Sequence, residues 1–300
     1  MERLDCFASL AMTREMSHTS FFSAPPSSNV LDMTSVEDIV RRAAAAFNAG
    51  RADEARRLCE QGLSRTPGEP ALSHLLAAVL FAVHDIAAAR SHITASLAKR
   101  PDNAAAHLLA ARIARASKDV DAALAHVDRA IALAPQREAF LEKARTFDQA
   151  GQRTPAREAW QAILKVIPDH GEAAARLGRF AWEDGDLAAA AAYLARATTG
   201  EAPASVWFDL GLVRQDLADH PGAAAAYRKA FALKPDFAEA ALNLGVALQE
   251  SGDTDAAMAA YASAYRLRPD MFGSIAMALT SAPHGRLWLD PAALRRALTA

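Results

Sequence analysis

The sequence predicts an all-α protein in which one helical hairpin recurs about seven times. The first observation is a proline that follows a helix-like segment roughly every 34 residues. The second is that alanine or glycine recurs at fixed places between these prolines. The third is composition. Of the 300 residues, 52% are hydrophobic and only 7% aromatic, and the abundant alanine favours closely packed helices over a β-sandwich.

The closing proline defines the repeated unit, and we number it position 32. Successive prolines are 34, 34, 33, 67 and 34 residues apart, and the long gap holds one further unit that ends at Pro203. The prolines are Pro67, Pro101, Pro135, Pro168, Pro235 and Pro269. Because proline breaks a helix, the second helix of each unit is expected to end just before this proline.

Two positions within the unit are always small. Position 20 is occupied by Ala55, Ala89, Ala123, Ala156, Ala190, Ala223 and Ala257. Position 8 is occupied by Ala43, Ala77, Ala111, Ala144, Gly178, Gly211 and Gly245. Antiparallel helices approach to about 8 Å only where the side chains at the crossing are small. These positions therefore predict where the two helices of a unit cross.

The turn between the two helices is predicted at position 15, where Gly50, Gly151, Gly185 and Gly252 lie. Glycine adopts the left-handed conformation that ends many helices. Pro155 falls shortly after this position, in the first turn of a second helix, where its missing N–H costs nothing.

These features resemble the tetratricopeptide repeat, a helix–turn–helix unit of 34 residues. The sixth unit carries the pattern, with Trp207, Leu210, Gly211, Ala223, Tyr227, Ala230 and Pro235. The resemblance implies a right-handed α-solenoid in which seven repeats cover residues 36–271.

The two ends differ from the array. Residues 1–35 are expected to be a disordered lead-in. Residues 1–15 are similar to translated intergenic repeat DNA of bacterial genomes, which would make Met16 the true start; an ordinary disordered tail is the alternative. Residues 272–300 are expected to form a partial eighth repeat and a capping helix, with Trp288 as a cap anchor or a docking residue.

The resemblance implies that first helices line a concave groove, into which positions 2, 5, 9 and 12 point. The expected peptide-binding residues are Arg112, Arg115, Arg145, Arg176, Arg179, Trp182, Phe208 and Phe81. Because an arginine fork pairs with carboxylates, this set favours an acidic or mixed acidic and apolar segment of another protein. The alternative is that neighbours such as Glu142, Asp148 and Glu183 neutralise the arginines within the chain.

No catalytic, metal-binding or cofactor-binding motif is present. The sequence lacks GxGxxG, GxxxxGK[ST], HExxH, CxxC and GxSxG patterns, so an enzyme is not expected. His92 and His126 share position 23 and are interpreted as solvated surface residues, with a metal pair as the alternative. His74 and His107 are expected to be groove or packing residues, and Cys59 a core residue.

The net charge, the length of the apolar runs and one missing motif reduce the number of functions to consider. The formal net charge of −2 argues against a nucleic-acid binder. No apolar run is long enough to cross a bilayer, and the expected location is cytoplasmic. The carboxylate clamp that family members use for chaperone tails is absent, because no basic residues follow Asn243 at Gly273 and Met277. We therefore expect a protein-binding scaffold or adaptor, with a docking subunit of an enzyme or secretion complex as the alternative and the oligomeric state undetermined.

Overall fold

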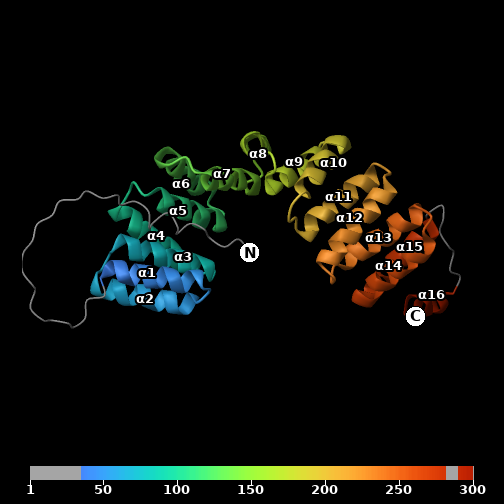
Figure 1. Ribbon diagram of the computed structural model, residues 1–300, viewed down its shortest axis with the longest axis horizontal. Helices are drawn as coiled ribbons and strands as arrows, with labels where there is room; N and C mark the ends of the chain where they lie inside the picture. The colour runs from blue at the N-terminus through green and yellow to red at the C-terminus, as the bar shows by residue number, and fades with distance from the viewer. Residues whose placement is uncertain (1–34, 282–289, 300) are drawn as a thin grey trace, which may run out of the picture. The chain divides into compact units, whose positions relative to one another are not determined.

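The computed structural model describes residues 35–281 and 290–299, and these residues form helices and turns without a strand (Figure 1). The helices are α1 (Val36–Asn48), α2 (Ala52–Arg65), α3 (Pro70–Ala82), α4 (Ile86–Lys99), α5 (Ala104–Ala116), α6 (Val120–Leu133), α7 (Arg137–Gln149), α8 (Arg153–Val166), α9 (Gly171–Glu183), α10 (Leu187–Ala197), α11 (Ala204–Asp216), α12 (His220–Leu233), α13 (Ala238–Glu250), α14 (Thr254–Leu267), the short 3₁₀ helix η2 (Pro269–Met271), α15 (Phe272–Ser281) and α16 (Pro291–Thr299). The predictions for residues 1–34 and for Trp288 lie outside the described residues.

The chain divides into two compact units, residues 1–156 and residues 157–300, and the boundary falls inside α8. Within each unit, the two helices of a repeat pack against each other, and the second helix also packs against the first helix of the next repeat. This is the arrangement of an α-solenoid, so the predicted fold class is confirmed.

The predicted small positions are buried where the helices cross. The residues at positions 8 and 20 that lie in the core include Ala43 and Ala55, both fully buried. A Cβ atom added at Gly211 would lie 2.5 Å from Cε1 of Tyr227, and one added at Gly245 would lie 2.5 Å from Cε1 of Tyr261. Glycine at position 8 therefore makes room for a large residue at position 24, a pairing that the sequence analysis did not anticipate.

The turn at position 15 adopts the left-handed conformation in all seven repeats. Gly50 has a φ of 76°, as predicted, but His84, Lys118 and Ala218 occupy the same position with φ values of 64°, 60° and 56°. A residue with a side chain in this conformation costs about 1 kcal/mol. The packing of the hairpin therefore imposes the turn where glycine is missing.

An aspartate begins most of the second helices. The carboxylates of Asp85, Asp119, Asp186, Asp219 and Asp253 each accept a hydrogen bond from a backbone N–H in the first turn of the helix that follows. This capping satisfies backbone donors that the helix itself leaves unpaired.

The last two α-helices that the structure describes are α15 and α16. α15 begins at Phe272, and α16 packs against α14 with Leu294 and Leu298 almost completely buried. The guanidinium of Arg295 lies over the ring of Phe272, 4.4 Å from its centroid. Leu294 and Leu298 thus cover apolar surface at the end of the array.

Candidate functional site

The first helices present a surface that we call the first-helix face. In the first unit it consists of the exposed sides of α1, α3, α5 and α7, and in the second unit of those of α9, α11, α13 and α15. Consecutive first helices are in contact from α1 to α7 and again between α9 and α11. Side chains of neighbouring repeats can therefore meet on this face.

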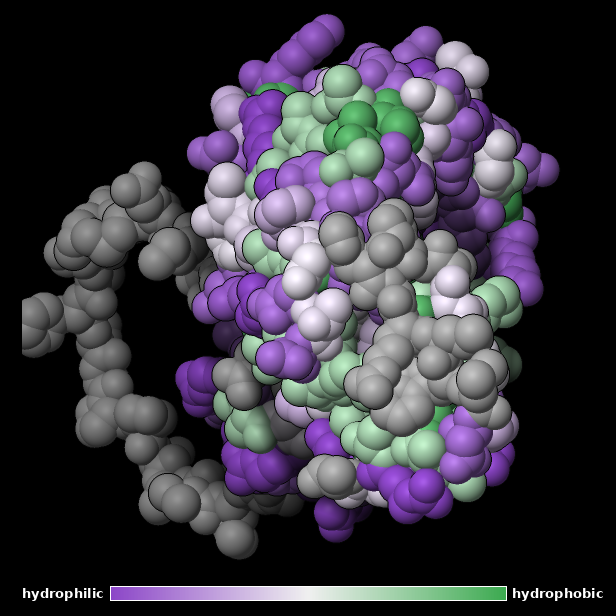
Figure 2. Space-filling view, turned by 90° about the vertical axis from the view of Figure 1, so that its right-hand side faces the viewer, coloured by the Kyte–Doolittle hydropathy of each residue, from purple (hydrophilic) through white to green (hydrophobic). Residues whose placement is uncertain are grey.

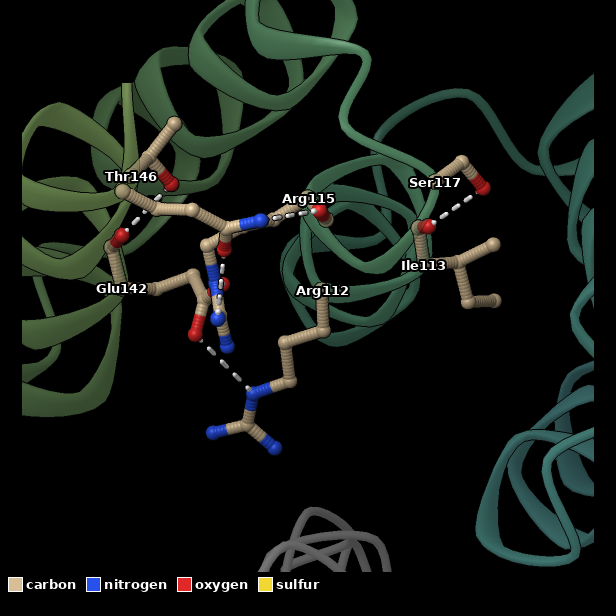
Figure 3. Close-up of polar contacts among 7 residues, drawn as sticks. Arg112, Ile113, Arg115, Ser117, Glu142 and Thr146 are labelled. Atoms are coloured by element: carbon tan, nitrogen blue, oxygen red, sulfur yellow. Dashed lines mark hydrogen bonds and ion pairs between the residues drawn. The ribbon is translucent and has the colours of Figure 1, made fainter. Parts of the chain in front are cut away.

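Two arginines of α5 share one carboxylate of α7 (Figure 3). Arg115 Nε donates to Glu142 Oε1 at 2.5 Å, and Arg112 Nε lies 3.7 Å from Glu142 Oε2. The side chain of Glu142 is only 1% exposed, whereas those of Arg112 and Arg115 are 15% and 28% exposed. Removing a carboxylate from water is costly unless cations compensate it, and here two cations do so.

Because Arg112 and Arg115 share a single carboxylate, this arrangement leaves one positive charge in excess. Arg115 Nη1 also donates to Gln149 Oε1 at 3.2 Å, and Gln149 Nε2 donates to the Arg115 carbonyl at 3.1 Å. The terminal nitrogens of Arg112 point away from Glu142 (Figure 3) and form no hydrogen bond within the described residues. One guanidinium fork, on a side chain that is 15% exposed, thus lies beside Glu142 with its terminal nitrogens turned away from that carboxylate.

In the second unit the corresponding arginine has its own carboxylate. Arg179 Nε donates to Asp209 Oδ2 at 2.7 Å, and Arg179 Nη2 lies 2.6 Å from the same oxygen. Three residues further along α9, Trp182 Nε1 donates to Asp216 Oδ2 at 2.8 Å. These contacts link α9 to α11 and neutralise the charge of Arg179.

The other predicted residues lie on first helices as well. Phe81 is on α3, Arg145 on α7, Arg176 on α9 and Phe208 on α11, and all four are partly exposed. Phe81 packs against the core of the first unit, and Phe208 against that of the second. Whether these residues bind a partner remains a prediction.

The sequence analysis named Glu142 as an internal partner but missed Asp209, Asp216 and Gln149. The number of residues between each of them and its partner could have revealed them. Arg112–Glu142 and Arg179–Asp209 are both 30 residues apart, which links position 9 to position 6 of the next repeat. Arg115–Gln149 and Trp182–Asp216 are both 34 residues apart.

One histidine, His126, is packed more tightly than predicted. His126 is partly buried, with its Nδ1 3.0 Å from Nδ1 of His107, whose Nε2 lies 2.9 Å from the Pro101 carbonyl oxygen. Burial, followed by the neighbouring His107, lowers the pKa of His126. The interpretation of His126 as a solvated residue was therefore wrong, because the hairpin brings α5 and α6 together at this point.

His74 and Cys59 are buried in the first unit, in agreement with their assignment as packing and core residues. Burial lowers the pKa of His74 to about 4 and raises that of Cys59 to about 12. Among residues 35–281 and 290–299, no three His, Cys, Asp or Glu side chains gather as metal ligands would.

Several large apolar side chains are exposed. Met277 on α15 is 67% exposed, and Val166 on α8 is 80% exposed. On the face seen in Figure 2, hydrophobic patches lie among hydrophilic ones. No helix in the described part of the chain has the length and apolar character to span a bilayer.

Comparison with known proteins identifies the repeat. The model of the tetratricopeptide repeat family matches residues 74–138, 141–206 and 208–272, which together make up more than half of the chain. No match is found among curated protein sequences.

Solved structures show the same fold at low sequence identity. PilW, a type IV pilus biogenesis factor, is 17% identical with a TM-score of 0.61, over 72% of this chain and all of PilW. PilF of Pseudomonas aeruginosa is 17% identical with a TM-score of 0.59, over 67% of this chain and 92% of PilF. The APC/C hetero-tetramer Cut9–Hcn1 gives 16% identity and a TM-score of 0.58 over 88% of this chain, which spans about half (49%) of the matched chain.

Proposed function

The chain belongs to the tetratricopeptide repeat family, whose repeats serve in general as scaffolds for protein–protein interaction, and we propose that its first unit holds an acidic and apolar segment of a partner protein on the first-helix face. The observation that carries this proposal is the fork of Arg112, whose terminal nitrogens are turned away from the buried carboxylate of Glu142 (Figure 3). The role proposed for the chain is docking rather than catalysis.

Charge supports an acidic partner. Arg112 and Arg115 are the two formal charges of α5, and the one buried carboxylate that they share balances only one of them. A partner carboxylate that reaches the terminal nitrogens of Arg112 would accept two parallel hydrogen bonds. The Arg112 side chain is only 15% exposed and lies beside Glu142, so part of its rotamer freedom is already lost before binding.

Apolar contacts would come from the neighbouring helix. Phe81 lies on α3, which packs against α5, and its ring is partly exposed. Aromatic and arginine side chains together supply most of the binding energy in many interfaces. Arg145 on α7 belongs to the same proposed surface, and Arg176, Arg179, Trp182 and Phe208 remain to be tested by substitution in the second unit.

The test is selection of random linear peptides displayed on phage against the immobilised full chain. The proposal expects enrichment of peptides with Asp or Glu next to apolar residues. A labelled peptide of this kind should bind Arg112→Gln about tenfold more weakly in fluorescence anisotropy, because a charge-assisted pair is lost.

Arg100→Gln, which removes an exposed arginine from the second-helix side of the same unit, is the matched control and should leave the affinity unchanged. If the acidic peptides bind Arg112→Gln as tightly as the natural chain, the proposal is wrong.

A further inference from the structure

Helices α11 and α13 of the second unit present the same pattern of side chains. Each carries two apolar residues and then a carboxylate, spaced by four residues, which places them along one side of the helix. The residues are Phe208, Leu212 and Asp216 on α11, and Leu242, Val246 and Glu250 on α13. Corresponding residues of the two helices are 34 apart, so the same pattern lies on consecutive first helices.

The apolar residues of this pattern are neither fully buried nor fully exposed. All four pack against the core cluster of the second unit and remain partly exposed to solvent. The ring of Phe208 also lies 4.7 Å from the ring of Phe237, the residue that precedes α13. The core therefore holds these side chains in place, so ordering them on binding would cost little entropy.

The two carboxylates lack a cation. Asp216 accepts the hydrogen bond of Trp182, and within the described residues neither Asp216 nor Glu250 forms an ion pair. Other carboxylates on the same helices are neutralised, since Asp209 pairs with Arg179 and Glu239 pairs with Arg268. The negative charge of this surface is thus concentrated next to the apolar residues.

We infer that this surface of α11 and α13 is a second docking site, which takes a partner segment with two apolar residues followed by a lysine or arginine. Successive residues of the pattern are about 6 Å apart along a helix, and α11 and α13 both pack against α12. Two apolar side chains of the segment fit over the four apolar residues, and a cation one turn further on lies between the two carboxylates. Charge complementarity selects this partner over an acidic one.

This inference goes beyond the function proposed for the first unit, and the two can fail separately because they depend on different residues. Phage selection against the full chain should yield a second class of peptides, with Lys or Arg next to apolar residues. A labelled peptide of this class should bind Asp216→Asn/Glu250→Gln about tenfold more weakly, since two charge pairs are lost. Asparagine at position 216 keeps an acceptor for Trp182, so the packing of α9 on α11 is preserved.

Two controls show whether the basic peptides depend on these two carboxylates in particular. Asp236→Asn/Asp255→Asn removes two exposed charges from elsewhere in the second unit and should leave the affinity unchanged. Arg112→Gln should weaken only the acidic class of peptides. A selection without basic peptides, or basic peptides that bind the double variant at full affinity, overturns the inference.

The occupant itself can be identified by a photocrosslinking amino acid placed at Val246. Crosslinks to an added basic peptide support the inference. Crosslinks that instead join two copies of the chain, or that join Val246 to another segment of the same chain even with peptide in excess, show a different occupant and overturn it.

Discussion

The first-helix faces of the two units use the same repeat positions to opposite electrostatic effect. In the first unit, Arg112 and Arg115 share Glu142, and a positive charge remains. In the second unit, Arg179 is paired one to one with Asp209, while Asp216 and Glu250 form no ion pair in the described part of the chain. An arginine at position 9 therefore does not set the local charge by itself; that charge also depends on how many arginines share the carboxylate on the next first helix.

The hairpins of the two units also differ in how they fill the same space. In the first unit, Ala43 at position 8 belongs to a repeat with the small Cys59 at position 24, and both are fully buried. In the second unit, Gly211 lies under the ring of Tyr227, whose hydroxyl donates to Gln215 Oε1 at 3.0 Å. Substitutions at these residues and at the ion pairs test both differences between the units.

The largest expected effect concerns position 24. Tyr227→Ala should destabilise the second unit by about 4 kcal/mol, because it leaves a cavity beside Gly211. Cys59→Ala should cost only about 1 kcal/mol in the first unit, because it removes a single sulfur atom. Urea unfolding followed by circular dichroism measures both losses, and hydrogen exchange shows which helices open. Equal losses would contradict the contrast in packing.

The next effect concerns the shared carboxylate. Glu142→Gln should cost about 3 kcal/mol, because Arg112 and Arg115 would then face each other without a counter-charge. Asp209→Asn should cost at most about 1 kcal/mol, because Arg179 is 40% exposed and can be hydrated. Unfolding free energies of the two variants give the comparison. A larger loss for Asp209→Asn would mean that the ion pair of the second unit is the more important one.

The sequence predicted the fold more completely than the site. Prolines such as Pro67 and alanines such as Ala55 recur in every repeat, so the helix pairs could be located from spacing alone. The pairing of the arginines depended on contacts between repeats, which the residues of a single repeat do not reveal. Glu142 was named because it is close in sequence to Arg145, whereas Asp209 lies 30 residues from Arg179 and was missed.

A smaller effect is expected from His74, whose burial in the first unit holds its pKa at about 4. The unfolded chain has an ordinary histidine pKa of about 6.5, so between these values the unfolded state binds a proton that the folded state does not. Stability is then greatest above pH 6.5, and should fall by about 1.5 kcal/mol between pH 6.5 and pH 5. His74→Gln should flatten this slope in urea unfolding at several pH values. An unchanged slope would assign the pH dependence to other groups.

The smallest effect distinguishes a structural role of Trp182 from a docking role. Trp182→Phe removes the hydrogen bond to Asp216 but keeps an aromatic ring, so the loss of stability should be about 0.5–1 kcal/mol. Because the indole N–H offsets part of the charge of Asp216, its removal should leave the affinity for a basic peptide equal or slightly higher. The acidic peptides should be unaffected, since they bind on the first unit. Trp182→Phe could instead weaken the binding of basic or acidic peptides about fivefold or more without a change in stability. In that case Trp182 contacts the partner directly, and the aromatic surface of the second unit contributes more to binding than the pairing of Arg179 with Asp209.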